Sequence, residues 1–225
     1  MKTKTVSEHT REQTGVLATI EKKVLIWLAE RLPEWVTSDQ LTLLGLFAMM
    51  MAGLSYWAAQ WDERALFLVV VALGLNWFGD SLDGTLARVR NRQRPRYGYY
   101  VDHVIDIVGA LFLIGGLAAS GYMTPLVGLG LLVGYMMVSA EIFLATYSLG
   151  IFRLSFGPIG GTELRILLSM GTLYLLYKPV VQLGDLGAFH LFDVAGICTT
   201  AGLAVALTVS AIRNTRTLYQ AEPLS

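Results

Sequence analysis

Four aspartates at helical spacing interrupt an otherwise hydrophobic stretch of the sequence. Asp80 and Asp83 are three residues apart, and Asp102 and Asp106 are four apart. Residues at these spacings lie on one face of a helix, so each pair presents two carboxylates side by side. Two antiparallel helices can bring all four carboxylates to one point, where they would be forced to take up protons unless a multivalent cation held them. Clustered carboxylate oxygens suit Mg²⁺, Mn²⁺ or Ca²⁺ better than Zn²⁺.

The elements that carry these aspartates are predicted to be membrane-spanning helices. The chain has 225 residues, of which 54% are hydrophobic, and a mean hydropathy of +0.55. This is too apolar for an ordinary soluble domain, and runs of about 17 to 25 apolar residues fit a hydrocarbon core of roughly 30 Å. We therefore expect an all-α polytopic membrane protein with six transmembrane helices at Leu41–Gln60, Ala65–Ala87, Gly98–Ser120, Met123–Tyr147, Thr162–Lys178 and Phe189–Ile212.

An amphipathic juxtamembrane helix is expected before the first span, because apolar residues recur at helical spacing from Val16 to Leu32 while charged residues take the other side. Such a helix can lie in the membrane interface or pack on the cytoplasmic ends of the spans. The chain divides into an N-terminal segment (1–40), a membrane domain (41–215) and a short tail (216–225). No secretory signal peptide is expected, because Met1 to Glu12 is polar and no short apolar core follows.

The basic residues predict the orientation of the spans. Of the 17 Lys and Arg residues, only Arg64 and Lys178 fall on the second side of a six-span arrangement. By the positive-inside rule the first side is cytoplasmic, and it holds both termini and the arginine-rich loop from Arg88 to Arg96. This loop could attract anionic groups, but for Arg90, Arg92 and Arg94 a purely topogenic role is favoured. A prokaryotic inner membrane suits a short chain without a targeting signal.

The segment from Asp80 to Asp106 resembles the signature of the CDP-alcohol phosphotransferase family, which reads DxxDGxxAR, eight or nine residues, and GxxxDxxxD. Every fixed position is matched, with nine residues between Arg88 and Gly98. The resemblance implies an integral-membrane enzyme of phospholipid biosynthesis that transfers a phosphatidyl group from CDP-diacylglycerol to an alcohol and releases CMP. It also implies two Mg²⁺ or Mn²⁺ ions, a homodimer in the lipid bilayer and no nucleic-acid partner.

The aspartates receive separate roles. Asp80, Asp83 and Asp102 are the expected metal ligands, because carboxylate-bound cations can neutralise a pyrophosphate and grip the leaving group. Asp106 either completes the metal site or takes the proton of the acceptor hydroxyl, and the resemblance implies that it is the catalytic base. Both roles are compatible with one shared carboxylate.

Small and basic residues beside the aspartates are expected to bind the nucleotide. Small side chains let a nucleotide lie against a helix backbone, although they also permit close helix packing. An arginine at the cytoplasmic edge can pair with a phosphate. The resemblance places the nucleotide pocket at Gly84, Ala87, Arg88, Gly98 and Thr42. Gly98 is also expected to open the third span, and Ser38 or Asp39 to cap the first.

Residues outside the signature are candidates for binding the acceptor. Glu141 could bind an acceptor hydroxyl or a cationic headgroup, or it could pair with another span. The other candidates are Arg153, Glu163 and Arg165. The turn that contains Glu163 loosely resembles a Gly-Pro-Thr-Glu stretch of choline and ethanolamine phosphotransferases, and the pair Asp102-His103 resembles an Asp-His pair of those enzymes.

Three other functions remain open. A CDP-choline or CDP-ethanolamine phosphotransferase would use diacylglycerol as the acceptor, which the Asp-His pair favours. His103 itself points about 100° away from Asp102 on a helix, so it is expected either to support the metal ligands from behind or to be a packing group, rather than to be a ligand. A divalent-cation transporter would place its acids near the bilayer centre on broken helices, and an inactive membrane scaffold would not need the full set of aspartates. The single cysteine, Cys198, excludes an intrachain disulfide.

Overall fold

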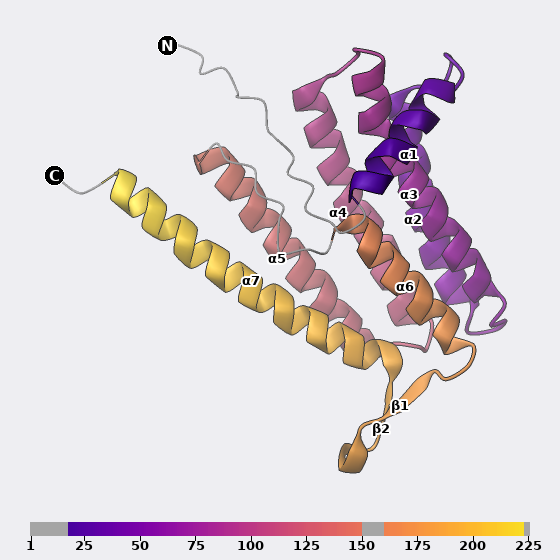
Figure 1. Ribbon diagram of the computed structural model, residues 1–225. Coiled ribbons are helices and arrows are strands. Elements are labelled where there is room, and N and C mark those ends of the chain that lie inside the picture. The colour runs from indigo at the N-terminus through magenta and orange to yellow at the C-terminus, as the bar shows by residue number, and fades with distance from the viewer. Residues whose placement is uncertain (1–17, 150–159, 223–225) are drawn as a thin grey trace.

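The computed structural model describes residues 18–149 and 160–222 (Figure 1). This part of the chain is almost entirely helical, which confirms the all-α prediction apart from one short hairpin. The elements are α1 (Ala18–Arg31), α2 (Ser38–Ala58), α3 (Ala65–Val89), α4 (Pro95–Ala119), α5 (Pro125–Leu149), α6 (Gly161–Leu175), β1 (Val180–Gln182), η1 (Gly184–Leu186), β2 (Ala188–His190) and α7 (Leu191–Ala221).

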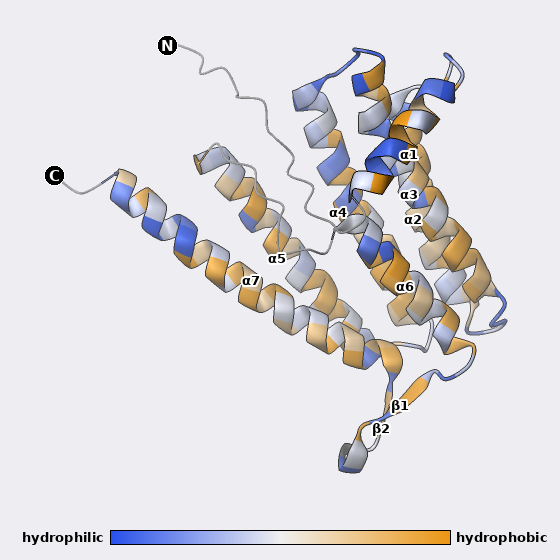
Figure 2. Ribbon diagram, in the orientation of Figure 1, coloured by the Kyte–Doolittle hydropathy of each residue, from blue (hydrophilic) through white to orange (hydrophobic). Residues whose placement is uncertain are grey.

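Five of these helices are long and apolar enough to cross a membrane, namely α2, α3, α4, α5 and α7. Figure 2 shows hydrophobic residues along their length and hydrophilic residues gathered at α1 and the connecting loops. Together they fit an integral membrane protein. The predicted count of six full-length spans is wrong in one place, because α6 has only 15 residues. Its helix ends at Leu175, shortly before Pro179, and the backbone of a residue that precedes proline is disfavoured in the helical region.

A short antiparallel hairpin separates α6 from α7. Val180 pairs with His190 and Val181 pairs with Phe189. Gly184 and Gly187 carry positive φ values of 51° and 98°, which glycine tolerates at no steric cost. Phe189 was predicted to begin the last span, but it belongs to β2, and α7 starts two residues later. The hairpin lies at the end of the molecule away from α1 (Figure 1).

The helix α1 packs on α3, as one of the two expectations for it required. Leu25 and Ala29 are buried in a cluster with Leu41, Leu82 and Leu86. The opposite side of α1 exposes Ile20, Val24 and Trp27. The helix therefore covers the bundle with one apolar face and presents a second one outward.

The start of α2 is capped by a residue that differs from the two expected. Thr37 Oγ1 accepts a hydrogen bond from the amide of Gln40 at 3.3 Å, and the Gln40 side chain accepts one from the amide of Thr37 at 2.8 Å. This reciprocal pair forms a capping box. Asp39, one of the expected caps, pairs instead with Arg94 at the start of α4.

Glycines bring the backbones of α2, α3 and α4 into direct contact. A Cβ placed on Gly116 of α4 would lie 2.0 Å from the carbonyl oxygen of Gly53 on α2. A Cβ on Gly79 of α3 would lie 2.5 Å from the carbonyl oxygen of Leu41 on α2. These glycines allow α2 to pack between the two helices that carry the aspartates, since a side chain at either point would separate the backbones.

The helices α5 and α7 run side by side and diverge from the other helices (Figure 1). At one end of the pair, the buried carboxylate of Asp193 accepts hydrogen bonds from the amide and the hydroxyl of Thr124, at 2.6 and 2.7 Å. Further along the pair, Glu141 accepts hydrogen bonds from two side chains of α7. Polar contacts inside an apolar pair of helices fix how the helices align along their axes.

Candidate active site

Three of the four aspartates meet in one pocket. Asp80 comes from α3, and Asp102 and Asp106 come from neighbouring turns of α4. Each offers a carboxylate oxygen, and these oxygens lie within 4.8 Å of one another. Asp80 and Asp102 are half-buried, whereas Asp106 is exposed. The pocket around them is lined by Thr42, Gly45, Met49, Asn76, Asp80, Asp102, Ile105, Asp106, Gly109 and Arg165. Three converging carboxylates suit a hard divalent cation.

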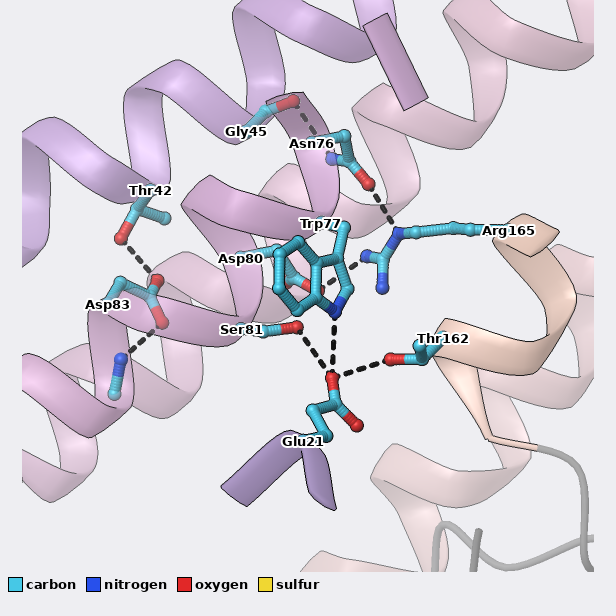
Figure 3. Close-up of polar contacts among 11 residues, drawn as sticks. Glu21, Thr42, Gly45, Asn76, Trp77, Asp80, Ser81, Asp83, Thr162 and Arg165 are labelled. Carbon is cyan, nitrogen blue, oxygen red and sulfur yellow. Dashed lines mark hydrogen bonds and ion pairs between the residues drawn. The ribbon is translucent and has the colours of Figure 1, made fainter. Parts of the chain in front are cut away.

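Arg165 of α6 holds Asp80 in this pocket. Its Nη2 atom donates to Asp80 Oδ2 at 2.5 Å, and its Nε atom donates to Asn76 Oδ1 at 2.7 Å (Figure 3). Asn76 Nδ2 in turn donates to the carbonyl oxygen of Gly45 on α2 at 3.0 Å. The guanidinium is thus fixed at two points on α3, one turn apart. It supplies the positive charge that partly balances the three carboxylates.

Asp83 lies one turn beyond Asp80 and interacts with α2. Its Oδ2 atom accepts a hydrogen bond from Thr42 Oγ1 at 2.6 Å, and its Oδ1 atom accepts one from the amide of Gly84 (Figure 3). Within the described residues, it is not among the three aspartates whose oxygens converge. The structure therefore brings together three of the four predicted metal ligands and gives Asp83 a neighbouring position.

The five predicted nucleotide residues lie on α2, α3 and the first turn of α4. Thr42 lines the pocket. Arg88 Nη2 donates to Thr85 Oγ1 at 2.9 Å, and a Cβ on Gly84 would lie 3.4 Å from Arg88 Nη1. Ala87 is half-buried on the same helix. Gly98 does not open α4 as predicted, because the helix starts at Pro95, whose fixed φ suits a first helical position.

Among the predicted acceptor residues that the structure describes, Arg165 alone lines the pocket. Glu163 Oε2 accepts a hydrogen bond from the amide of Gly160 at 3.0 Å and caps α6. Glu141 accepts hydrogen bonds from Ser210 Oγ at 3.0 Å and from Asn214 Nδ2 at 2.7 Å, both on α7. For Glu141, the alternative of pairing with another span is thus realised. Arg153 lies outside the described residues.

His103 makes the contacts expected of a packing group. Its ring stacks on Tyr99 with the ring centroids 4.1 Å apart, and it meets Phe143 edge-on at 5.1 Å. Its Nδ1 atom lies 2.7 Å from the carbonyl oxygen of Tyr99 and 3.8 Å from Asp102 Oδ2. The ring therefore braces the turn that carries Asp102 against α5.

Two residues of the arginine-rich loop do more than set topology. Arg90 donates to the carbonyl oxygens of Leu32, Pro33 and Val36, at 2.9, 2.9 and 2.5 Å. These carbonyls follow the end of α1, so Arg90 caps that helix and ties it to α3. Arg94 pairs with Asp39, and this hydrogen bond raises the pKa of the arginine. The predicted purely topogenic role is wrong for these two arginines, because their guanidinium groups find carbonyl and carboxylate acceptors nearby.

Two site residues were not foreseen. Asn76 stands four residues before Asp80 inside an apolar run, so a polar side chain on the same helical face was a usable signal. Glu21 accepts hydrogen bonds from α3 and α6, and only its place in the juxtamembrane helix is visible in the sequence. No pattern in the sequence indicates its partners.

The long apolar helices and the three converging carboxylates together define a polytopic membrane protein with a candidate divalent-cation centre. The family model for CDP-alcohol phosphatidyltransferases matches residues 32–212, and the chain belongs to this family. The matched segment contains α2 to α6 and most of α7, and therefore every helix that lines the pocket.

Individual relatives share parts of the chain. It is 32% identical to cholinephosphotransferase 1 of Gallus gallus in a match 154 residues long that covers 64% of this chain and 44% of that protein. It is 29% identical to archaetidylinositol phosphate synthase of Pyrococcus horikoshii over 104 residues, which are 46% of this chain and 52% of that protein. The chain thus spans about half the length of the curated relatives it matches.

The fold is also found in a solved structure. The crystal structure of Mycobacterium tuberculosis phosphatidylinositol phosphate synthase with CDP-DAG bound superposes with a TM-score of 0.57 at 21% sequence identity. The match covers 89% of this chain and 94% of that one. At this identity the match establishes the shared membrane fold.

Proposed function

We propose that the protein transfers a phosphatidyl group from CDP-diacylglycerol to an alcohol and releases CMP. The observation that carries this proposal is the convergence of Asp80, Asp102 and Asp106 within 4.8 Å in one pocket, in a chain of this family. The archaeal relative is a synthase of an inositol phosphate lipid, and the protein of the matching crystal structure binds CDP-DAG. Both support a nucleotide-linked lipid as the donor.

The converging carboxylates fit one or two divalent cations. Asp80, Asp102 and Asp106 would hold Mg²⁺ or Mn²⁺. Asp83, which lies one turn beyond Asp80 on α3, is proposed as a further ligand. Bound there, a cation would neutralise the pyrophosphate and the departing CMP. Carboxylate, amide and hydroxyl oxygens line this pocket, and such hard ligands match these cations.

Asp106 is proposed as the base, because it is the exposed member of the three carboxylates. Its carboxylate takes the proton of the acceptor hydroxyl while the acceptor oxygen forms a bond to the phosphorus that carries diacylglycerol. The phosphoanhydride bond breaks in line, and CMP leaves with the bonding electrons. We place the nucleotide along Thr42, Gly84, Ala87, Arg88 and Gly98, and the acceptor beside Arg165.

The cellular setting belongs to the same proposal. The distribution of basic residues supports a cytoplasmic active site with both termini on that side, in the inner membrane of a prokaryote. The protein is proposed to act as a homodimer. The proposed organisation is an N-terminal segment, one catalytic membrane domain and a short tail, and the family match over residues 32–212 supports the central part.

A second candidate is the transfer of a CDP-linked headgroup, such as that of CDP-choline, to diacylglycerol. The relative from Gallus gallus is a cholinephosphotransferase and shares 32% identity with this chain. In addition, Asp102 is followed by His103, which resembles the Asp-His pair of such enzymes. The two candidates use the same carboxylates and differ in the donor.

The test is CMP release by the purified protein with Mg²⁺ or Mn²⁺, with each donor supplied separately against pooled alcohols or diacylglycerol. We expect release from CDP-diacylglycerol that Asp106→Asn abolishes and Asp185→Asn, in the distant hairpin, leaves unchanged. Release from CDP-choline with diacylglycerol would reverse the donor. If a folded protein with bound metal released CMP from neither donor, the transferase proposal would fail in favour of a transporter or an inactive scaffold.

A further inference from the structure

We infer that Glu21 of α1 is a positioning residue that holds the start of α6 against α3 and thereby sets Arg165 beside Asp80. The inference rests on the proposed cation centre, since it concerns the pairing of Arg165 with Asp80, one of the carboxylates of that centre. It assigns the juxtamembrane helix a role in the active site, in addition to covering the bundle.

One carboxylate oxygen of Glu21 joins three helices. Its Oε1 atom accepts hydrogen bonds from Trp77 Nε1 at 2.9 Å and from Ser81 Oγ at 3.4 Å, both on α3. The same atom accepts a hydrogen bond from Thr162 Oγ1 on the first turn of α6 at 2.6 Å. Figure 3 shows the carboxylate between the two helices, with the three donors pointing to it. We call these three hydrogen bonds the Glu21 latch.

The latch and the Arg165 ion pair connect the same two helices at adjacent levels. On α3, Trp77 and Ser81 flank Asp80 in the sequence and lie one turn apart. On α6, Thr162 precedes Arg165 by three residues, so both side chains emerge from the same face. A shift of the α6 start that lengthened the Thr162 contact would also move the guanidinium relative to Asp80.

The latch matters because it holds the first turn of a short helix. The helix is only 15 residues long, and the residues that precede Gly160 lie outside the described part. Within the described residues, side-chain hydrogen bonds join this end of α6 to the rest of the fold at Thr162, through Glu21, and at Arg165, through Asn76 and Asp80. Breaking the first removes one of these two side-chain connections at the start of the helix.

A cation and Arg165 compete for the charge of Asp80. The guanidinium lies 2.5 Å from Asp80 Oδ2, and a positive group at that distance opposes the binding of a divalent ion to the same carboxylate. Loss of the latch loosens the start of α6 and lowers the fraction of molecules in which Arg165 pairs with Asp80. Because the guanidinium then competes less with the cation, cation binding should tighten. The effect must pass through Arg165, which makes it testable by a double-mutant cycle.

The experiment titrates the full-length protein in lipid nanodiscs with Mn²⁺ alone and measures free Mn²⁺ by electron paramagnetic resonance. We expect Arg165→Ala to tighten Mn²⁺ binding by about tenfold and Glu21→Ala by about threefold, with no further gain from Glu21→Ala in the Arg165→Ala background. Glu21→Gln, which keeps an oxygen acceptor, should restore most of the wild-type affinity.

Thr162→Val removes only the hydrogen bond between α6 and Glu21, and it should tighten Mn²⁺ binding as Glu21→Ala does. This variant keeps the test valid if Glu21→Ala fails to fold. The matched control is Thr208→Val, because Thr208 is exposed on α7 and its hydroxyl donates to Ala204 of its own helix at 2.8 Å. Wild-type affinity in both Glu21→Ala and Thr162→Val, or an equal gain with and without Arg165, would overturn the inference. Absence of Mn²⁺ binding in the wild-type protein would instead overturn the cation centre and the inference with it.

Discussion

Arg165 and Asp80 form an ion pair that joins α6 to α3 across 85 residues of sequence, with 2.5 Å between Nη2 and Oδ2. Both side chains are about one-fifth exposed, at 20% and 23%. An ion pair this sheltered is less screened by salt than a surface pair. The site therefore keeps one of its carboxylates paired with an internal positive charge, and two further carboxylates line the same pocket.

Arg165→Lys is expected to lower CMP release by about tenfold to a hundredfold, and to do so through the KM of the acceptor. Lysine keeps the charge but lacks the planar fork that contacts Asn76 and Asp80 together. The measurement is the initial rate against acceptor concentration, with Arg216→Lys on α7 as the control. An unchanged KM for the acceptor would contradict the proposed role.

Removal of the metal is expected to abolish CMP release, and added Mn²⁺ should restore it. Asp80→Asn and Asp102→Asn should each weaken Mn²⁺ binding by more than about tenfold, because each removes one of three converging carboxylates. Asp83→Asn should have a smaller effect if its contact with Thr42 persists when the cation is bound. Calorimetric titration of the three variants checks this order, and an Asp83 effect as large as the others would make it a full ligand.

Gly116→Ala is expected to destabilise the protein by about 1 to 3 kcal/mol, because its Cβ would lie 2.0 Å from the carbonyl oxygen of Gly53. The matched control is Gly115→Ala, one residue earlier on the same helix, where no atom lies within 4 Å of the added Cβ. Thermal unfolding in detergent should show a lower Tm for the first variant alone. Equal Tm values would mean that α2 and α4 do not meet as described.

Arg90→Ala is expected to release the end of α1 from α3. The variant leaves three backbone carbonyls without their charged donor, at a cost on the order of 1 to 3 kcal/mol. Limited proteolysis should cut the segment between α1 and α2 faster than in the wild type. Arg92→Ala, an exposed neighbour in the same loop, should be cut at the wild-type rate.

Glu141→Ala is expected to lower the Tm and to leave the KM of the acceptor unchanged. Its carboxylate accepts hydrogen bonds from Ser210 and Asn214, so the loss falls on the contact between α5 and α7. Ser210→Ala should lower the Tm in the same direction, since it removes one donor of that contact. A higher KM with an unchanged Tm would instead support the acceptor role that the sequence offered as an alternative for Glu141.

Much of the fold was predictable because the length and the hydropathy of a segment are enough to identify a membrane helix. The starts of five predicted spans agree with the starts of helices to within a few residues. The aspartate spacing predicted that all four aspartates converge, and three of them, Asp80, Asp102 and Asp106, do so. These features depend on local periodicity, which a single sequence carries.

The remaining features depend on contacts between distant segments. The pairing of Arg165 with Asp80, of Glu141 with Ser210 and of Arg90 with the end of α1 joins residues more than fifty positions apart. A charged residue within an apolar segment indicates that it needs a polar partner, but the sequence does not show which residue the partner is. The shortness of α6 was missed for a different reason, because Leu176 and Tyr177 continue its apolar run beyond Leu175, where the helix ends.

The length of α6 also bears on the thickness of the lipid bilayer around it. At 1.5 Å per residue its 15 residues reach about 22 Å, against a hydrocarbon core of roughly 30 Å. If α6 spans the bilayer, the lipid must thin or deform locally along this helix, whose start carries the latch and Arg165. Acyl-chain length thereby becomes a variable of the protein's own environment, and a membrane of thinner lipids should hold the site with less elastic strain.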